Sequence, residues 1–279
     1  MATLVLTPAT APDAAHPGRV RRALADALTS ATRILLHYRH SPGLIVASLA
    51  VPVVMVVVFG YVFGSAMQVP GGGSYREFLM PGLFAMVAVN GIMPNMVGAA
   101  RDIDRGAADR IRSMPVSRAG VLLGTALADL VVGLAVLVPL AGVGLAAGWR
   151  IHRGPADAIA GLALLVLFRF VMTWVGTCLG LAVGKEEQAA QLAALTFPLG
   201  MVTNVFVPTG GMPGWLRAVA DWNPVSAVVA ACRELFGNPA AASSAWPLEH
   251  PVVVTLGWSG LLLVICAPLA VRAYGAHGR

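Results

Sequence analysis

Long apolar blocks separated by short polar segments run through most of the chain. Six blocks have the length of a membrane-spanning helix, namely residues 43–64, 78–100, 120–147, 156–183, 189–207 and 251–271. A helix rises about 1.5 Å per residue, so each block is long enough to cross a hydrocarbon core about 30 Å thick. Pro81 and Pro94 are expected to kink the second span. The pattern predicts an all-α integral membrane protein with six transmembrane helices.

The first 40 residues carry no such block. Residues 1–19, rich in Pro, Ala and Thr, are predicted to be a disordered tail. Residues 20–40 are predicted to form an amphipathic helix, because apolar side chains recur at helical spacing and arginines lie off that stripe. The stripe comprises Leu24, Leu28, Ala31, Leu35 and Tyr38. Such a helix suits an anionic membrane surface, although a solvated helix has the same pattern. Residues 41–279 then form the transmembrane domain.

Composition argues against a soluble protein. Of the 279 residues, 57% are hydrophobic and 11% are charged, whereas charged residues make up about 25% of soluble domains. The formal net charge is +6, but the basic residues flank the apolar blocks instead of clustering on one face. No nucleic-acid partner is therefore expected.

The distribution of Arg and Lys predicts the orientation of the spans. With a cytoplasmic N-terminus, thirteen basic residues lie in cytoplasmic segments and five in external ones, and Arg169 lies inside a span. Cytoplasmic loops carry the excess of positive charge in membrane proteins. Both termini are therefore expected in the cytoplasm. The heavy use of Arg, Ala, Gly and Val is typical of a GC-rich bacterial genome, which favours a bacterial plasma membrane.

The segment 101–118, between the second and third spans, is predicted to be a short cytoplasmic helix. Asp102 and Asp104 would lie at its start and Arg110 and Arg112 at its end, which complements the helix dipole. Pro115 would end it. The alternative is a charged turn that only fixes the topology.

Two segments resemble a known family of transporters. Asp104-Arg105-Gly106-Ala-Ala-Asp109-Arg110, followed by Ser-Met-Pro-Val-Ser and a Gly-Val-Leu-Leu-Gly stretch, is similar to the coupling-helix region of ABC-2 type permeases. The segment from Asn223-Pro224 through Arg233-Glu234 to Gly237 resembles the one that precedes their last span. The closest branch is the daunorubicin-resistance-like and nodulation-export-like one. Ala107, Ala108 and Asp109 differ from the residues usual in the family.

The resemblance implies a homodimer of permeases in which each copy docks a cytoplasmic ABC ATPase. The implied docking residues are Arg101, Asp102, Asp104, Arg105, Asp109, Arg110, Arg112 and Pro115. The chain itself has no ATPase motif, because its one lysine, Lys185, lies in Gly180-Leu-Ala-Val-Gly184-Lys185-Glu186, which lacks the Walker spacing and hydroxyl. ATP and magnesium are therefore expected on the partner ATPase, and no catalytic, cofactor or metal residue is expected in this chain.

Two charged residues and three glycines stand out inside the spans. Asp129 and Arg169 are expected to form a buried ion pair, because a lone charge at membrane depth is unfavourable by about 2.5–3.5 kcal/mol. Arg169 facing an acidic substrate, or pairing across a dimer interface, are the alternatives. Gly176, Gly180 and Gly184 are expected to let another helix approach closely.

The segment before the last span is predicted to add short external helices that do not cross the membrane. Asn223 is expected to cap a helix that begins at Pro224 and ends at Gly237. By resemblance these helices are re-entrant and cover the exit side. Arg233 and Glu234 are expected to anchor the helix at the membrane interface, with gating of the exit as the alternative.

Together these features predict the membrane subunit of an ATP-driven exporter of a hydrophobic drug or secondary metabolite. Its expected partners are the ATPase, a second permease copy, membrane lipid and the hydrophobic substrate. The alternatives are an ABC-2 exporter of a lipid-linked saccharide or polymer and a secondary transporter. The secondary transporter fits less well, because no glutamate lies in any span and Asp129 is the only acid expected to be buried.

Overall fold

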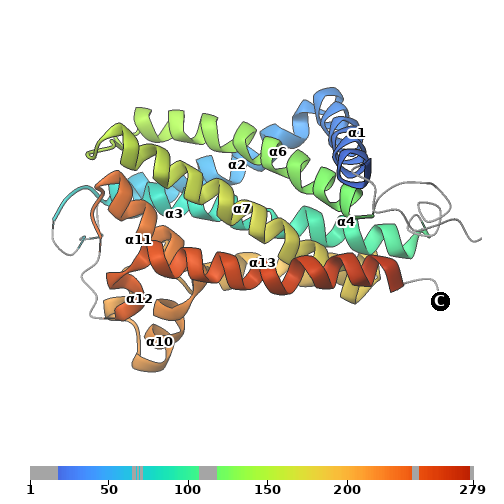
Figure 1. Ribbon diagram of the computed structural model, residues 1–279. Helices are drawn as coiled ribbons and strands as arrows, with labels where there is room; N and C mark the ends of the chain where they lie inside the picture. Colours follow the sequence, from blue (N-terminus) through green and yellow to red (C-terminus); the bar gives the residue numbers. More distant parts are fainter. Residues whose placement is uncertain are drawn as a thin grey trace, which may run out of the picture.

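The computed structural model describes residues 18–64, 67, 69, 72–106, 118–240 and 245–276, and within these ranges all regular secondary structure is helical (Figure 1). The predicted all-α fold class is confirmed. The predicted tail lies almost entirely outside the described residues. The helices are α1 (Gly18–His40), α2 (Pro42–Val57) continued by a π-helix (Val58–Phe63), α3 (Tyr75–Val89), α4 (Ile92–Asp104), α6 (Arg118–Ala146), α7 (Pro155–Val183), α8 (Glu186–Ala194), α9 (Thr196–Met201), α10 (Gly214–Trp222), α11 (Pro224–Phe236), α12 (Trp246–Glu249) and α13 (Pro251–Ala276), with a 3-10 turn at Thr209–Gly211.

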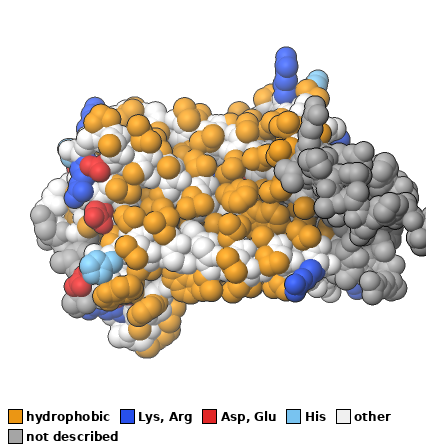
Figure 2. All heavy atoms as spheres, viewed as in Figure 1, with side chains coloured by type: hydrophobic (Ala, Val, Ile, Leu, Met, Phe, Trp, Pro, Cys, Tyr) orange, Lys and Arg blue, Asp and Glu red, His pale blue; other side chains and the backbone are white. Residues whose placement is uncertain are grey.

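The long helices run side by side between two ends of the bundle (Figure 1). At one end lie α1, the last turn of α4, the α7–α8 turn and the C-terminus of α13; we call this the terminal end. At the other lie α10, α11 and α12; we call this the distal end. On the face that Figure 2 shows, apolar side chains cover the middle of the bundle and charged ones gather toward its ends. This distribution matches an apolar slab of lipid with water on either side.

Five of the predicted spans are long apolar helices in the part of the chain that the structure describes. They cover Pro42–Phe63, Tyr75–Asp104, Ala119–Ala146, Pro155–Val183 and Pro251–Tyr274. The predicted fifth span differs, because it divides into α8 and α9 and then leaves the helix altogether. Pro198 explains the first division, since it has no N–H for the carbonyl of Ala194, where α8 ends.

The second span is also broken, at Asn90 and Gly91 between α3 and α4. Pro94 has no N–H to donate to the carbonyl of Asn90, so the expected kink becomes a break one turn before the proline. The side-chain amide of Asn95 donates a hydrogen bond to the carbonyl oxygen of Gly91, one of the two residues at the break, at 2.7 Å. Pro81, the other expected kink, lies inside α3, which continues through it.

α4 packs along α7 through the predicted glycine seam. A Cβ atom at Gly176 would collide with the carbonyl oxygen of Ile92, and one at Gly180 would collide with that of Met96. Only glycine therefore allows these two backbones to approach so closely. Gly184 has a φ of 70° and ends α7 in the left-handed conformation. It therefore caps the helix, whereas Gly176 and Gly180 form the close packing contacts.

α1 packs on α6 mainly through small residues. Ala27 and Ala31 are buried, and a Cβ atom at Gly124 would collide with the carbonyl oxygen of Ala27. Of the expected apolar stripe, Leu24 and Leu28 remain 56% and 63% exposed. The first half of the stripe thus faces away from the bundle, whereas Ala31 is buried and the rest of the stripe is half-buried.

Candidate functional site

Asp129 of α6 and Arg169 of α7 form an ion pair buried between the helices. Nη2 of Arg169 lies 2.9 Å from Oδ1 of Asp129, and Nε donates to the carbonyl oxygen of Asp129 at 3.0 Å. The hydroxyl of Thr173 donates to the second carboxylate oxygen at 2.9 Å. Both charged side chains are about one-tenth exposed. The pair is thus neutral as a unit and well supplied with hydrogen bonds, which a buried charge needs.

Two glycines make room for this pair. A Cβ atom at Gly133 would collide with the guanidinium of Arg169, so that group lies against the bare backbone of α6. A Cβ atom at Gly91 would lie 3.2 Å from a carboxylate oxygen of Asp129. Gly91 is also part of the break in the second span. The charged pair and the helix break therefore occupy the same place in the bundle.

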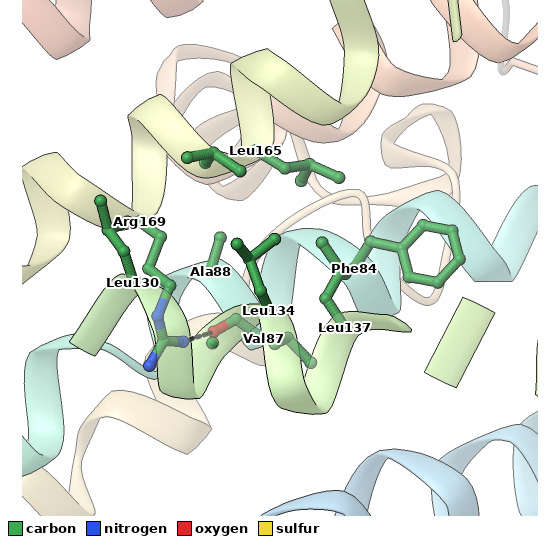
Figure 3. Close-up of a pocket in the computed structure, with 10 residues that line it drawn as sticks. Phe84, Val87, Ala88, Leu130, Leu134, Leu137, Leu165 and Arg169 are labelled. Carbon is green, nitrogen blue, oxygen red and sulfur yellow. Dashed lines mark hydrogen bonds between the residues drawn. The ribbon is translucent and has the colours of Figure 1, made fainter. Parts of the chain in front are cut away.

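Arg169 also binds the end of α3. Its Nη1 donates to the carbonyl oxygen of Val87 at 2.6 Å, as the dashed line in Figure 3 shows. Val87 lies in the last turn of α3, where carbonyl groups lack helical partners and a cation is favourable. Around this bond Phe84, Leu134 and Leu165 line a narrow apolar crevice between α3, α6 and α7. Arg169 is the only residue with a polar side chain among the described residues that line this crevice.

At the terminal end, two of the predicted docking residues bind the start of α8. Nε of Arg101 lies 2.8 Å from one oxygen of Glu186, and Nη2 of Arg105 lies 3.0 Å from the other. Asp104 accepts a longer contact of 3.5 Å from the backbone N–H of Glu186. The two arginines hold the pKa of the Glu186 carboxyl below its ordinary value. α4 and α8 are therefore joined by charge at this end.

The position of these residues corrects the expected helix of the coupling segment. Arg101, Asp102 and Asp104 lie in the last turn of α4, and Arg105 is its C-cap. The acids thus end the second span and do not begin a separate helix, because the apolar helix continues past the expected boundary at residue 100. Asp109, Arg110, Arg112 and Pro115 lie outside the described residues.

At the distal end, α11 begins and ends at the expected residues. The side chain of Asn223 accepts a hydrogen bond from the backbone N–H of Val225 at 2.8 Å, and Pro224 occupies the first helical position. Gly237 ends the helix with a φ of 71°. Glu234 is exposed.

Arg233 was expected to anchor α11 at the membrane interface. It is instead buried inside the protein, with 1% of its surface exposed. Its guanidinium donates to the carbonyl oxygens of Phe78, Asn204 and Val205 at 3.0, 2.9 and 3.2 Å. It also lies over the ring of Phe78, 3.5 Å from the centroid. Burial lowers the pKa of Arg233 to about 9, so the group stays charged at neutral pH. Arg233 thus binds α11 to α3 and to the end of the fifth span.

The other groups of that non-helical end are bonded in the same way. The hydroxyl of Tyr75 donates to the carbonyl oxygen of Phe206 at 2.8 Å. The backbone N–H of Asn204 donates to the hydroxyl of Ser226 at 3.2 Å, and its side-chain amide donates to the carbonyl oxygen of Ser226 at 3.1 Å. Buried irregular backbone needs such partners, because a buried polar group without a hydrogen bond is destabilising.

Several residues of these clusters were not anticipated from the sequence. They are Tyr75, Gly133, Thr173, Pro198, Glu186 and Ser226. Pro198 offered a local signal, the missing N–H for the carbonyl of Ala194, but Pro81 lacks the same donor inside the continuous α3, so this signal alone did not predict a break. The others depend on which helices are neighbours, which the sequence does not state. No group of His, Cys, Asp or Glu with metal-binding geometry occurs among the described residues.

A helical bundle of this length, with apolar spans, a buried charge pair and charged ends, defines a multi-span membrane protein. A family model for ABC-2 type transporters matches residues 27–236, and the chain therefore belongs to that family. The match begins in α1 and ends at the last residue of α11, so it includes all the clusters described above.

Several relatives carry names that refer to drug resistance or multidrug transport. The chain is 27% identical over 253 residues to the "Daunorubicin resistance ABC transporter permease protein DrrB1" of Streptomyces coeruleorubidus, an alignment covering 90% of this chain and 87% of the relative. It is 23% identical to the "Probable doxorubicin resistance ABC transporter permease protein DrrC" of Mycobacterium tuberculosis, over 89% and 88% of the two chains. The "Probable multidrug ABC transporter permease YbhR" of Escherichia coli is 24% identical over 67% of this chain and 50% of its own length.

Proposed function

We propose that the chain is the permease subunit of an ATP-driven exporter of a hydrophobic drug or secondary metabolite. The observation that carries this proposal is the match to drug-resistance permeases over about nine-tenths of this chain and of those relatives. The energy comes from a separate ATPase, which binds ATP and magnesium. Two copies of the permease form the transporter in a bacterial plasma membrane.

In this proposal the terminal end faces the cytoplasm and binds the ATPase. The last turn of α4 carries Arg101, Asp102 and Asp104 directly into the segment that the family resemblance assigns to docking. Arg101 and Arg105 bind Glu186, so a movement of the docking segment reaches both α4 and α8. These two helices belong to the two broken spans. The Arg101–Glu186 and Arg105–Glu186 ion pairs therefore connect the proposed docking segment with the two spans whose helices are interrupted.

The buried pair has a structural role in this proposal. Arg169 already donates to Asp129 and Val87, and the crevice beside it is narrow and apolar. The acid and the helix end together satisfy the guanidinium beside the break in the second span. It does not need a substrate acid to remain buried.

Co-purification with an ABC ATPase from the same genome tests the proposed role. The tagged permease in detergent is expected to retain the ATPase, and daunorubicin is expected to raise ATP hydrolysis by the complex. Replacement of residues 101–106 by a Gly-Ser segment of equal length should release the ATPase, whereas the same replacement of residues 150–154 at the distal end should not. An ATPase that stays bound to the first variant contradicts docking at the terminal end.

A further inference from the structure

The distal half of the bundle is held together by side chains that bind backbone. Arg233 of α11 reaches carbonyl groups of both α3 and the non-helical residues 204 and 205. Tyr75 of α3 binds the carbonyl group of Phe206 from the other side. Gly82 of α3 touches Val205 so closely that a Cβ atom would lie 2.9 Å from the Val205 carbonyl oxygen. We call α3, residues 203–206 and α11 the distal block.

The terminal half has a different set of contacts. Met96 and Ala100 of α4 pack against Ala189 and Ala193 of α8 in one buried cluster. The glycine seam joins α4 to the second half of α7. Glu186 adds its bonds to Arg101 and Arg105. We call α4, α8 and the second half of α7 the terminal block.

Spans two and five pass from one block to the other, and each is broken where it does so. In span two the break is at Asn90 and Gly91. In span five the helix ends at Met201, and the backbone from Val202 onward is irregular. A continuous helix transmits a movement along its whole length, whereas a broken one allows its two halves to rotate separately. Spans two and five are therefore interrupted at the boundary between the blocks, whereas α7 runs unbroken from the side of α11 into the terminal block.

We propose that Arg233 is a positioning residue for export, since its guanidinium holds the distal block as one body while the terminal block moves against it. The inference rests on the proposed function, because the ATPase supplies the movement. Arg233 suits this role because one planar group bonds carbonyls of two elements and also lies over the ring of Phe78, the residue whose carbonyl it bonds in α3. In the described part of the chain no carboxylate forms a salt bridge with Arg233. Its donors therefore go to backbone carbonyls and to the Phe78 ring.

Hydrogen exchange of the full-length permease in lipid nanodiscs tests the structural half of the proposal. Arg233→Met keeps much of the side-chain volume and removes every donor. Exchange should rise about tenfold or more in peptides covering residues 203–207 and 224–236, because several charge-assisted bonds are lost. Peptides covering residues 92–104 and 186–194 should not change. Arg153→Met, which removes an exposed arginine from the distal end, is the matched control and should resemble the wild type.

Transport by the permease with its ATPase tests the functional half. In inverted vesicles, Arg233→Met should lower daunorubicin uptake per ATP hydrolysed by about tenfold while the ATPase remains bound. A residue that only maintained folding would lower uptake and hydrolysis together and leave their ratio unchanged. Arg233→Lys retains the charge without the planar fork and should give an intermediate ratio.

The outcomes separate the two proposals. Wild-type exchange and a wild-type uptake ratio in Arg233→Met overturn the role of Arg233. If that variant does not fold, Tyr75→Phe is used, which removes one hydrogen bond to Phe206. It should raise exchange at residues 203–207 by about fivefold. Unchanged exchange there would contradict the existence of the distal block. If the wild type shows no ATP-driven uptake, the proposed function fails and the export role of Arg233 with it. The exchange pattern still decides whether the block exists.

Discussion

The guanidinium of Arg169 lies 2.9 Å from the carboxylate of Asp129 and packs against the backbone of Gly133, which is on α6 with Asp129. The same group donates to Val87 at the end of α3. One buried pair thus joins three helices at the break in the second span. Arg233 similarly joins helices at the non-helical end of the fifth span, where it donates to carbonyl groups instead of to a carboxylate.

Loss of either partner of the buried pair should destabilise the protein strongly. Asp129→Ala leaves the Arg169 charge unpaired, and removing one member of a buried pair typically costs about 3–5 kcal/mol. Thermal unfolding in detergent should show a large fall in midpoint for Asp129→Ala and for Arg169→Met. The double variant should recover much of the loss, because no unpaired charge remains. An Asp129→Ala variant with wild-type unfolding and transport would show that the pair does not support the bundle.

Gly133→Ala should destabilise the protein although it adds a single methyl group. The new Cβ atom would occupy the position of the Arg169 guanidinium, so the pair has to move apart. We expect a loss of about 1–3 kcal/mol, typical of an overpacked core. Gly142→Ala on the same helix is the control, since a Cβ atom there meets nothing within 4 Å. Equal unfolding midpoints for the two variants would contradict the close approach of Arg169 to α6.

The α4–α7 seam should be equally sensitive at Gly180. A Cβ atom at that position collides with the carbonyl oxygen of Met96, and backbone cannot move aside as a flexible side chain does. Gly180→Ala is expected to lower the unfolding midpoint and the amount of protein in the membrane. Gly257→Ala on α13, where a Cβ atom has open space, should leave both unchanged.

The α4–α8 link should depend on pH only in strong acid. The pKa of Glu186 is lowered by Arg101 and Arg105, so its ionised form is stabilised in the folded protein. The contribution is therefore complete above the ordinary pKa of a glutamate, about 4.3, and is lost as the pH falls through the lower folded value. The protection factors of amides in residues 101–106, which correct exchange for its intrinsic dependence on pH, should stay constant between pH 7 and pH 5. Glu186→Gln should lower these protection factors throughout that range, and equal protection in this variant would contradict the link.

The hydrophobic pattern was sufficient to predict the helical class and five of the spans, because span length and composition are properties of a local stretch. It was also sufficient to suggest the partner of Arg169, since Asp129 is the only acid that lies away from the ends of the predicted spans. The fate of Arg233 could not be predicted in this way. Its burial depends on Phe78 and Asn204, which lie 155 and 29 residues away and meet it only in the folded bundle. Burial also reverses the usual expectation for an arginine near a helix end.

The fifth span failed as a continuous helix for a local reason that the apolar block concealed. Pro198 divides it, and the carbonyl groups freed beyond Met201 accept hydrogen bonds from side chains of α3 and α11. Averaging hydrophobicity over the block gives no weight to a single missing N–H.

ATP-driven uptake of daunorubicin tests the central claim most directly. Inverted vesicles that contain the permease and its ATPase should accumulate the drug when ATP is added, and should not when the ATPase is omitted or its catalytic residue is replaced. A proton ionophore should leave the rate unchanged. Uptake that needs the proton gradient and continues without the ATPase would contradict the account and favour a secondary transporter.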